Sequence, residues 1–144
     1  MEPSPDTPEP PRAPTPGPGA SQIPATSPAR LAESLTETWS PRVIGVLDDC
    51  YVKVAKLHGQ LLWHSHADED ELFYVLEGHL KIELESGVVQ VAPGELFIVP
   101  KGVRHNPIAE DPCLVMLLER KSTKHTGDAL DARTRSIQEQ LRPL

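Results

Sequence analysis

The sequence has few cysteines, few aromatic residues and no long apolar run. Cys50 and Cys113 are its two cysteines, which is too few for the disulfide framework that stabilises many small secreted domains. We therefore expect two buried, reduced thiols in a cytoplasmic protein. No apolar run approaches the roughly 20 residues that a membrane-spanning helix needs. The formal net charge of −7 argues against nucleic acid and anionic membrane surfaces as partners.

Proline, in contrast, is abundant but unevenly distributed along the chain. Ten of the sixteen prolines lie between Pro3 and Pro28, where apolar side chains are scarce. Such a segment cannot bury enough surface to offset the entropy of ordering it, so residues 1–27 are predicted to be a disordered tail with polyproline II bias. Its Pro-x-x-Pro spacings suit proline-recognition domains, but the composition favours a solvated tail.

Short helices are predicted on both sides of the central region. Ser27 and Pro28 suit an N-cap and a first helical turn, and Leu31 and Leu35 would share one helical face, so residues 28–41 form a short helix and arm. The C-terminal tail, residues 121–144, contains a loose apolar helical face among charged residues, which would pack on the main domain or on a partner, or fray. The residues of this face are Ala129, Leu130, Ile137 and Leu141.

Residues 42–120 carry the signals of a β-protein. Residues 79–85 alternate strictly, with Leu80, Ile82 and Leu84 on one face and charged residues on the other. Apolar runs of similar length recur between glycine and proline turns, and Pro107 and Pro112 bracket a predicted loop. About eight short strands of this kind are typical of a sandwich or barrel. The predicted strands are 43–47, 51–57, 60–66, 71–76, 79–85, 88–91, 96–99 and 114–118.

Candidate metal ligands gather in the stretch from Gly59 to Gly78. In an extended strand, residues two apart point to the same side, so His64 and His66 would face one way together. Glu71 would begin the next strand after an acidic loop. Two imidazoles and a carboxylate suit a divalent transition metal, and His105 is the best candidate for a fourth ligand.

At these residues the sequence resembles the cupins, a family of small β-barrel proteins. The first motif of the family is glycine, H-x-H, three or four residues, glutamate, six residues and glycine. His64, His66, Glu71 and Gly78 match it. Only four residues separate Gly59 from His64, where five are usual.

The second cupin motif is glycine, five residues, P-x-G, two residues, histidine, three residues and asparagine. Gly94, Pro100, Gly102 and His105 match it. Ala109 stands where the family has its closing asparagine, a departure that affects no metal ligand. The resemblance covers residues 42–119.

The resemblance implies an all-β fold, a double-stranded β-helix (cupin or jelly-roll) barrel over residues 42–120 with the short helices outside it. The resemblance also implies a homodimer. It further implies one divalent transition metal ion for each chain, bound by His64, His66, Glu71 and His105. This ligand set does not distinguish Fe, Mn, Ni, Zn or Cu.

The function implied is that of a metal-dependent protein acting on a small polar molecule, of the isomerase, lyase or oxygenase type. The alternative is a non-catalytic metal- or small-ligand-binding or sensor module, because fold does not fix function. A regulator would usually add a basic DNA-binding helical region, and the sequence has no such segment. No residue is assigned as a catalytic acid or base.

Glu71 is the last residue of an acidic run, residues 68–71, which could simply face water. Glu71, Phe73 and Val75 share one face by parity, so this carboxylate would stand at the mouth of an apolar interior. A lone ionised carboxylate there is costly, and a bound cation removes that cost. Residues 68–70 are predicted to be a solvated rim. The remaining histidines fit no ligand pattern: His58, His79 and His125.

Side chains on the opposite parity are predicted to face outward. Trp63 alternates with His64, and Leu72, Tyr74 and Leu76 form an apolar outer face. Such a face favours coverage by a second subunit.

Overall fold

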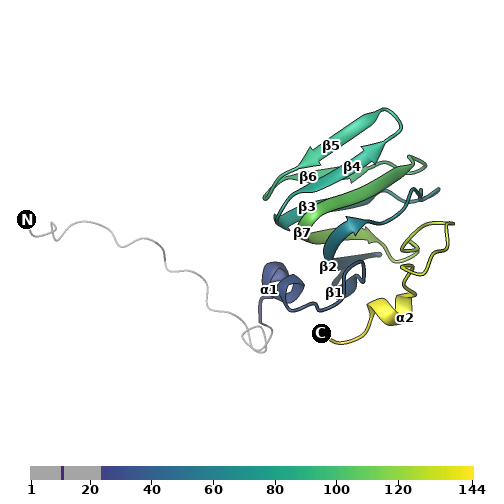
Figure 1. Ribbon diagram of the computed structural model, residues 1–144. Coiled ribbons are helices and arrows are strands. Elements are labelled where there is room, and N and C mark those ends of the chain that lie inside the picture. Colours follow the sequence, from purple (N-terminus) through teal and green to yellow (C-terminus); the bar gives the residue numbers. More distant parts are fainter. Residues whose placement is uncertain (1–10, 12–23) are drawn as a thin grey trace, which may run out of the picture.

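The computed structural model describes residue 11 and residues 24–144 (Figure 1). The predicted disorder of residues 1–27 therefore falls almost entirely outside the described residues. Helix α1 (Pro28–Glu33) begins where Ser27 accepts a hydrogen bond from the Arg30 N–H at 3.3 Å, and a proline occupies its first turn. The helix thus covers only the first part of the predicted helix and arm, residues 28–41.

Antiparallel strands make up most of the described chain. They are β1 (Arg42–Leu47), β2 (Cys50–Gln60), β3 (Glu71–Glu77), β4 (Leu80–Leu84), β5 (Gly87–Val91), β6 (Leu96–Val99) and β7 (His105–Arg120). They hydrogen-bond in the order β1-β2-β7-β3-β6, and β4 joins β5 to β7. The predicted all-β barrel with minor helices is confirmed.

Strand β7 is the centre of this sheet. Residues 105–108 pair with β4, and residues 114–119 pair with β3. Strand β2 runs along the other edge of both parts. Because one long strand has two different neighbours along its length, the sheet curls around an interior (Figure 1).

Two predicted boundaries are wrong. The expected strand 60–66 is not formed, because β2 ends at Gln60 and His64 makes only an isolated bridge with His105. The expected loop between Pro107 and Pro112 lies instead within β7. Pro107 has no N–H to donate, but its carbonyl oxygen accepts from Leu61 N at 3.1 Å. The exposed residues 110–112 lie where the β2–β7 register shifts, so they are not paired with β2.

The interior is packed with apolar side chains from every wall of the barrel. Strand β3 shows the predicted alternation, with Glu71, Phe73 and Val75 buried and the residues between them partly exposed. Cys113 is buried within this core. Cys50 is partly exposed, so the prediction of two buried thiols is wrong for that residue, although both cysteines are free.

Helix α1 covers part of the outer surface of the barrel. Ala32 and Leu35 are buried against Val54 and Leu114, and Leu76 packs on the same cluster. The apolar outer face predicted on β3 is therefore covered in part by the chain itself. This coverage reduces the outer surface that a second subunit could occupy.

The C-terminal tail is less helical than predicted. Helix α2 (Ile137–Gln140) has Ser136 as its N-cap, in a capping box with Glu139. Residues 121–136 form turns and loops, and Leu130, expected on a helical face, is 88% exposed. The predicted face from Ala129 to Leu141 is wrong because the helix forms only after its capping residue.

These C-terminal loops lie against the barrel beside the H-x-H segment. A Cβ atom at Gly127, whose φ is +58°, would clash with the carbonyl oxygen of Ser65. The Arg133 guanidinium donates to Gln60 O at 2.7 Å. These contacts place the segment after β7 next to the predicted metal ligands.

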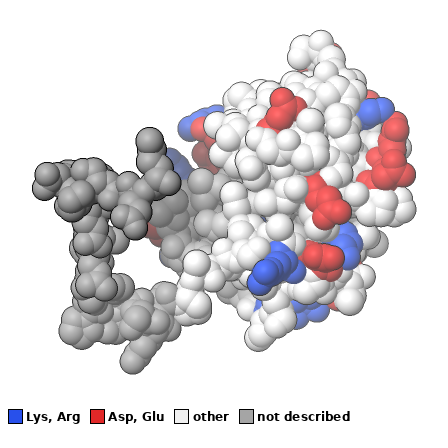
Figure 2. Space-filling model, turned by 90° about the vertical axis from the view of Figure 1, so that its left-hand side faces the viewer, with Lys and Arg blue, Asp and Glu red and all other residues white. Residues whose placement is uncertain are grey.

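The outer surface carries charges of both signs. On the face drawn in Figure 2, acidic and basic side chains are scattered with uncharged surface between them. Among residues 24–144, no helix has the length and hydropathy needed to cross a bilayer.

Candidate metal centre

The four predicted ligands come from three places in the chain. His64 and His66 lie between β2 and β3, while Glu71 and His105 are the first residues of β3 and β7. His64 and His105 exchange two backbone hydrogen bonds, of 3.0 and 2.9 Å. This pairing fixes the two histidines opposite each other, at the point where β7 begins.

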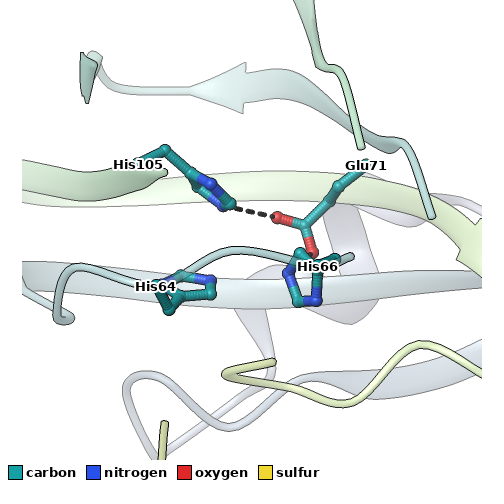
Figure 3. Close-up of side chains that lie close together, drawn as sticks. All are labelled: His64, His66, Glu71 and His105. Atoms are coloured by element: carbon teal, nitrogen blue, oxygen red, sulfur yellow. Dashed lines mark ion pairs between the residues drawn. The ribbon is translucent and has the colours of Figure 1, made fainter. Parts of the chain in front are cut away.

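The four side chains point toward one another (Figure 3). One nitrogen or oxygen from each lies within 4.8 Å of the others. Glu71 Oε2 is 3.3 Å from His66 Nε2, and Glu71 Oε1 is 3.5 Å from His105 Nε2. All four residues are buried, with at most 5% exposure. The structure thus brings together every residue that the sequence predicted for this site.

Backbone carbonyl oxygens orient the rings of His64 and His105. His64 Nδ1 lies 2.9 Å from Leu62 O, and His105 Nδ1 lies 3.0 Å from Val103 O. A carbonyl oxygen only accepts, so both Nδ1 atoms donate a hydrogen bond to it, which leaves the Nε2 of each ring as the atom available to the cluster. Metal-binding histidines are commonly held in this way.

Several nitrogen atoms of the cluster lack a hydrogen-bond partner. Within the described chain, both ring nitrogens of His66 and the Nε2 of His105 are buried without one. Buried polar atoms are normally satisfied, and an unsatisfied one is costly. A cation among these nitrogens and the Glu71 carboxylate would satisfy them, so this donor set fits a divalent transition metal ion.

The electrostatics also favour the unprotonated ligand forms. Burial, followed by the neighbouring His105, lowers the pKa of His64 to about 4. Burial alone would raise the pKa of Glu71, but its contacts with His105 and His66 outweigh burial and hold the pKa well below its usual value. His64 is therefore neutral and Glu71 ionised at neutral pH, as metal binding requires.

A buried ion pair that sequence reasoning missed lies behind Glu71. Glu119 pairs with Glu71 across β3 and β7. Lys53, on β2, is fully buried, and its Nζ lies 2.5 Å from Glu119 Oε1 and 2.6 Å from Gln140 Oε1 of α2. Parity could have indicated that Lys53 points inward with Ala55, as Glu71 does with Phe73, but not that Lys53 contacts Glu119.

Glu119 responds to this crowded environment. Burial, followed by the Glu71 charge, raises the pKa of Glu119 well above its usual value, although Lys53 opposes that shift. Two carboxyl groups this close do not both ionise easily. Lys53 therefore stabilises the negative charge that the two acids share.

His125 is the third residue that the sequence did not indicate. It belongs to the C-terminal segment, and its Nδ1 accepts a hydrogen bond from Arg135 N at 2.9 Å. Burial lowers its pKa to about 4, so the ring is neutral at physiological pH. The sequence assigned His125 no ligand role, because no local motif marks it.

His125 lines a small cavity of about 30 Å³ together with two of the candidate ligands, His64 and Glu71. This volume holds roughly two water molecules. Its lining residues are Trp39, Pro41, Ala55, Leu57, Leu61, His64, Glu71, Phe73, Pro107, Val115, Leu117, Glu119 and His125.

A larger and more open hollow lies beside His66. It has a volume of about 160 Å³ and is formed by residues 65–69 together with Ser122, Lys124 and residues 127–128. Its walls carry acidic, basic and hydroxyl groups. The hollow gives a polar approach to the His66 side of the cluster.

Comparison with known proteins places the barrel in a family. The family described as "Cupin domain" matches residues 51–119. The uncharacterized protein YdbB of Bacillus subtilis (strain 168) is 34% identical over 76 residues, which cover 52% of this chain and 67% of that protein.

Two solved structures extend the comparison to the fold. A cupin-2 domain containing protein from Shewanella frigidimarina has 36% identity and a TM-score of 0.65, covering 67% of this chain and 94% of its own. Protein NMB1881 from Neisseria meningitidis has 26% identity and a TM-score of 0.62, covering 68% and 100%.

The buried ion pair gives a prediction for stability. Replacing Lys53 by Met should lower the free energy of unfolding by about 3–5 kcal/mol, because Glu119 is left buried without its partner. Lys81→Met is the matched control, since Lys81 lies 2.6 Å from Glu110 in an exposed pair and should contribute only about 0–1 kcal/mol. Urea unfolding measures both. Equal losses in the two variants would contradict the prediction.

A second prediction concerns acid stability of the protein treated with a chelator. The folded pKa of His125, about 4, lies below the usual 6.5, so between these values the unfolded chain binds a proton that the folded chain does not. Stability should therefore fall as the pH drops through this window, with His125 contributing up to ~1.4 kcal/mol per pH unit.

The variant His125→Asn isolates this contribution, since asparagine can still accept from the Arg135 N–H. The free energy of unfolding of this variant should fall less steeply with decreasing pH than that of the wild type. The difference in slope corresponds to the uptake of up to one proton on unfolding. Urea unfolding at several pH values between 4 and 6.5 provides both slopes, and parallel slopes would rule out the assignment.

Proposed function

The chain belongs to the cupin family, and on that premise we propose that it is a metal-dependent enzyme acting on a small polar molecule. One observation carries the proposal. Buried ring nitrogens of His64, His66 and His105 meet the Glu71 carboxylate, with two of the rings held so that their lone pairs face the cluster. Metal chemistry accounts for this arrangement, because an apolar interior otherwise disfavours unpaired polar atoms.

The proposed ligands of the metal are His64, His66, Glu71 and His105. Three neutral imidazoles and one carboxylate would leave a divalent ion with a net charge near +1 and with positions open to an oxygen ligand. When bound, such an ion supplies Lewis-acid or O2 chemistry. Fe, Mn, Ni, Zn and Cu all accept these donors, so the donor set leaves the metal open.

The size and lining of the site indicate the substrate class. The interior holds only a small ligand beside the ion, so most of a substrate would lie in the hollow next to His66. Asp68, Glu69 and Lys124 line that hollow and favour a polar molecule with hydrogen-bonding groups. Isomerase, lyase and oxygenase reactions all suit an oxygen-bearing substrate of this kind.

A non-catalytic binding or sensor module is the second candidate. The observation that favours it is the packing of the C-terminal segment against the H-x-H segment, with Gly127 against Ser65. A site covered in this way could hold an ion and a small ligand without turnover. Measurement of turnover separates the two candidates.

The test begins with metal analysis of protein purified without added metal. We expect about one transition metal ion per chain, and its loss in His64→Ala, because one of the four donors is removed. His58→Ala is the control, since His58 is exposed and outside the cluster. A His64→Ala variant that kept its metal would overturn the proposed site.

Substrate screening with the native metal follows. Oxygen consumption with an iron-loaded protein would support an oxygenase, and turnover without oxygen would support an isomerase or lyase. Tight ligand binding with no turnover would support the sensor.

We also propose that the protein forms a homodimer through β6. This strand ends the hydrogen-bonded path of the sheet, and Leu96 and Ile98 on it are 55% and 47% exposed. Trp63 is 37% exposed, with the Arg104 guanidinium 5.9 Å from its ring centre. An exposed apolar edge strand favours pairing with another copy.

Ile98→Glu should therefore shift the protein from dimer to monomer in analytical ultracentrifugation. Val88→Glu is a control, because Val88 is similarly exposed, at 54%, but lies on β5. A wild-type protein that sediments as a monomer would contradict the dimer.

A cytoplasmic location is proposed as well. Its support is chemical, since Cys50 and Cys113 are both free and reduced thiols are usual in the cytosol.

A further inference from the structure

The candidate site has a second side, formed by the segment that follows β7. His125 lies on this segment and lines the small cavity together with His64, Glu71 and Glu119. Glu71 and His64 are close enough to influence its pKa electrostatically. His125 thus faces the same small space as the proposed metal ligands, from a part of the chain outside the two motifs.

Its ring has the opposite tautomer to the ligand rings. Arg135 N–H donates to His125 Nδ1, so this nitrogen must be unprotonated and the proton of the neutral ring sits on Nε2. His64 and His105 carry their proton on Nδ1 and present a lone pair. The free nitrogen of His125 therefore carries a proton and can donate a hydrogen bond. The free nitrogens of His64 and His105 carry a lone pair and can bind a cation.

We propose that His125 donates its Nε2–H to the oxygen or anion that occupies the open position of the metal. This inference rests on the proposed metal site and names one further residue of it. The backbone N–H of Arg135 occupies Nδ1, which leaves Nε2 as the free ring nitrogen of a residue that lines the small cavity and also the hollow of the C-terminal segment. Within residues 24–144 the side-chain hydrogen bond of His125 is the one at Nδ1, and Nε2 is not among the buried atoms that lack a partner, so it can be reached by a small ligand.

A chain of hydrogen bonds holds His125 in this position. Lys53 Nζ donates to Gln140 Oε1, and Gln140 Nε2 donates to Arg135 O at 3.1 Å. The N–H of Arg135 then fixes the His125 ring. The buried lysine of the barrel wall therefore positions the C-terminal segment, and through it the donor. A histidine that served packing alone would not need a fixed tautomer facing a cavity lined by metal ligands.

The inferred ligand is a small group with a negative or strongly accepting atom. The cavity of about 30 Å³ admits a water molecule, dioxygen or one oxygen of a larger substrate. A neutral N–H donor discriminates among these in favour of anions and carbonyl or carboxylate oxygens. A donor aimed at developing negative charge also favours a transition state that places charge on that oxygen.

Azide binding to the Cu(II)-loaded protein tests the inference, because azide is a small anion whose coordination is followed by its charge-transfer absorption. His125→Phe removes the donor and should weaken azide binding about tenfold, the effect of losing one hydrogen bond to a charged group. Copper content should remain that of the wild type. His125→Gln, which retains an acceptor and a donor, should recover part of the affinity.

His58→Phe is the matched control, because it makes the same chemical change at an exposed position and should leave azide affinity unchanged. Wild-type azide affinity in a folded, copper-loaded His125→Phe protein would overturn the inference. Wild-type protein that takes up no copper would instead contradict the proposed metal site. The two failures are therefore distinguishable.

A measurement on the wild type keeps the inference testable if His125→Phe does not fold. Long-range 1H–15N NMR of the Zn(II)-loaded protein reports the tautomer of each histidine. We expect an Nε2–H signal for His125, which shifts when azide is added. An Nδ1–H tautomer at His125 would overturn the inference without any substitution.

Discussion

Burying several polar, titratable side chains in an apolar barrel is the constraint on which the rest of this structure depends. Four such groups, His64, His66, Glu71 and His105, lie at most 5% exposed, and desolvation of each is unfavourable unless it is satisfied. The backbone exchange between His64 and His105 fixes where the rings enter the interior. Carbonyl oxygens accept from Nδ1 of these two rings and leave their Nε2 atoms for a cation. The barrel thus supplies an oriented, dry donor set, which is what metal chemistry needs.

A second set of buried polar groups connects this site to the C-terminal segment. Lys53 contacts both Glu119, beside the candidate ligand Glu71, and Gln140 of α2. A lysine this deeply buried is stable as a cation only with such partners. The same contact that compensates the acidic charge near the site therefore also holds the segment that carries His125. The Lys53 ammonium group therefore contacts both the acidic side of the site and the helix that follows the His125 segment.

The location of the approach to the site follows from the same packing. The segment after β7 lies against Ser65 through Gly127, where a side chain would clash with backbone, and it leaves a polar hollow next to His66. A substrate is expected to meet the site from that side. The C-terminal segment, which no ligand motif includes, therefore forms part of the wall of the approach to the four clustered side chains.

The sequence by itself determined the all-β fold, the four candidate ligands and the inward direction of Glu71, because strand parity and motif spacing are local properties of the chain. It misplaced the strand at 60–66 and the loop around Pro107, since pairing with distant residues decides those boundaries. Lys53, Glu119 and His125 became visible only in the tertiary structure. Their partners lie on other strands or on the C-terminal segment, and no local pattern records a contact between residues 66 or 87 positions apart. Long-range packing, which determines the second side of the site, is therefore what the sequence alone could not provide.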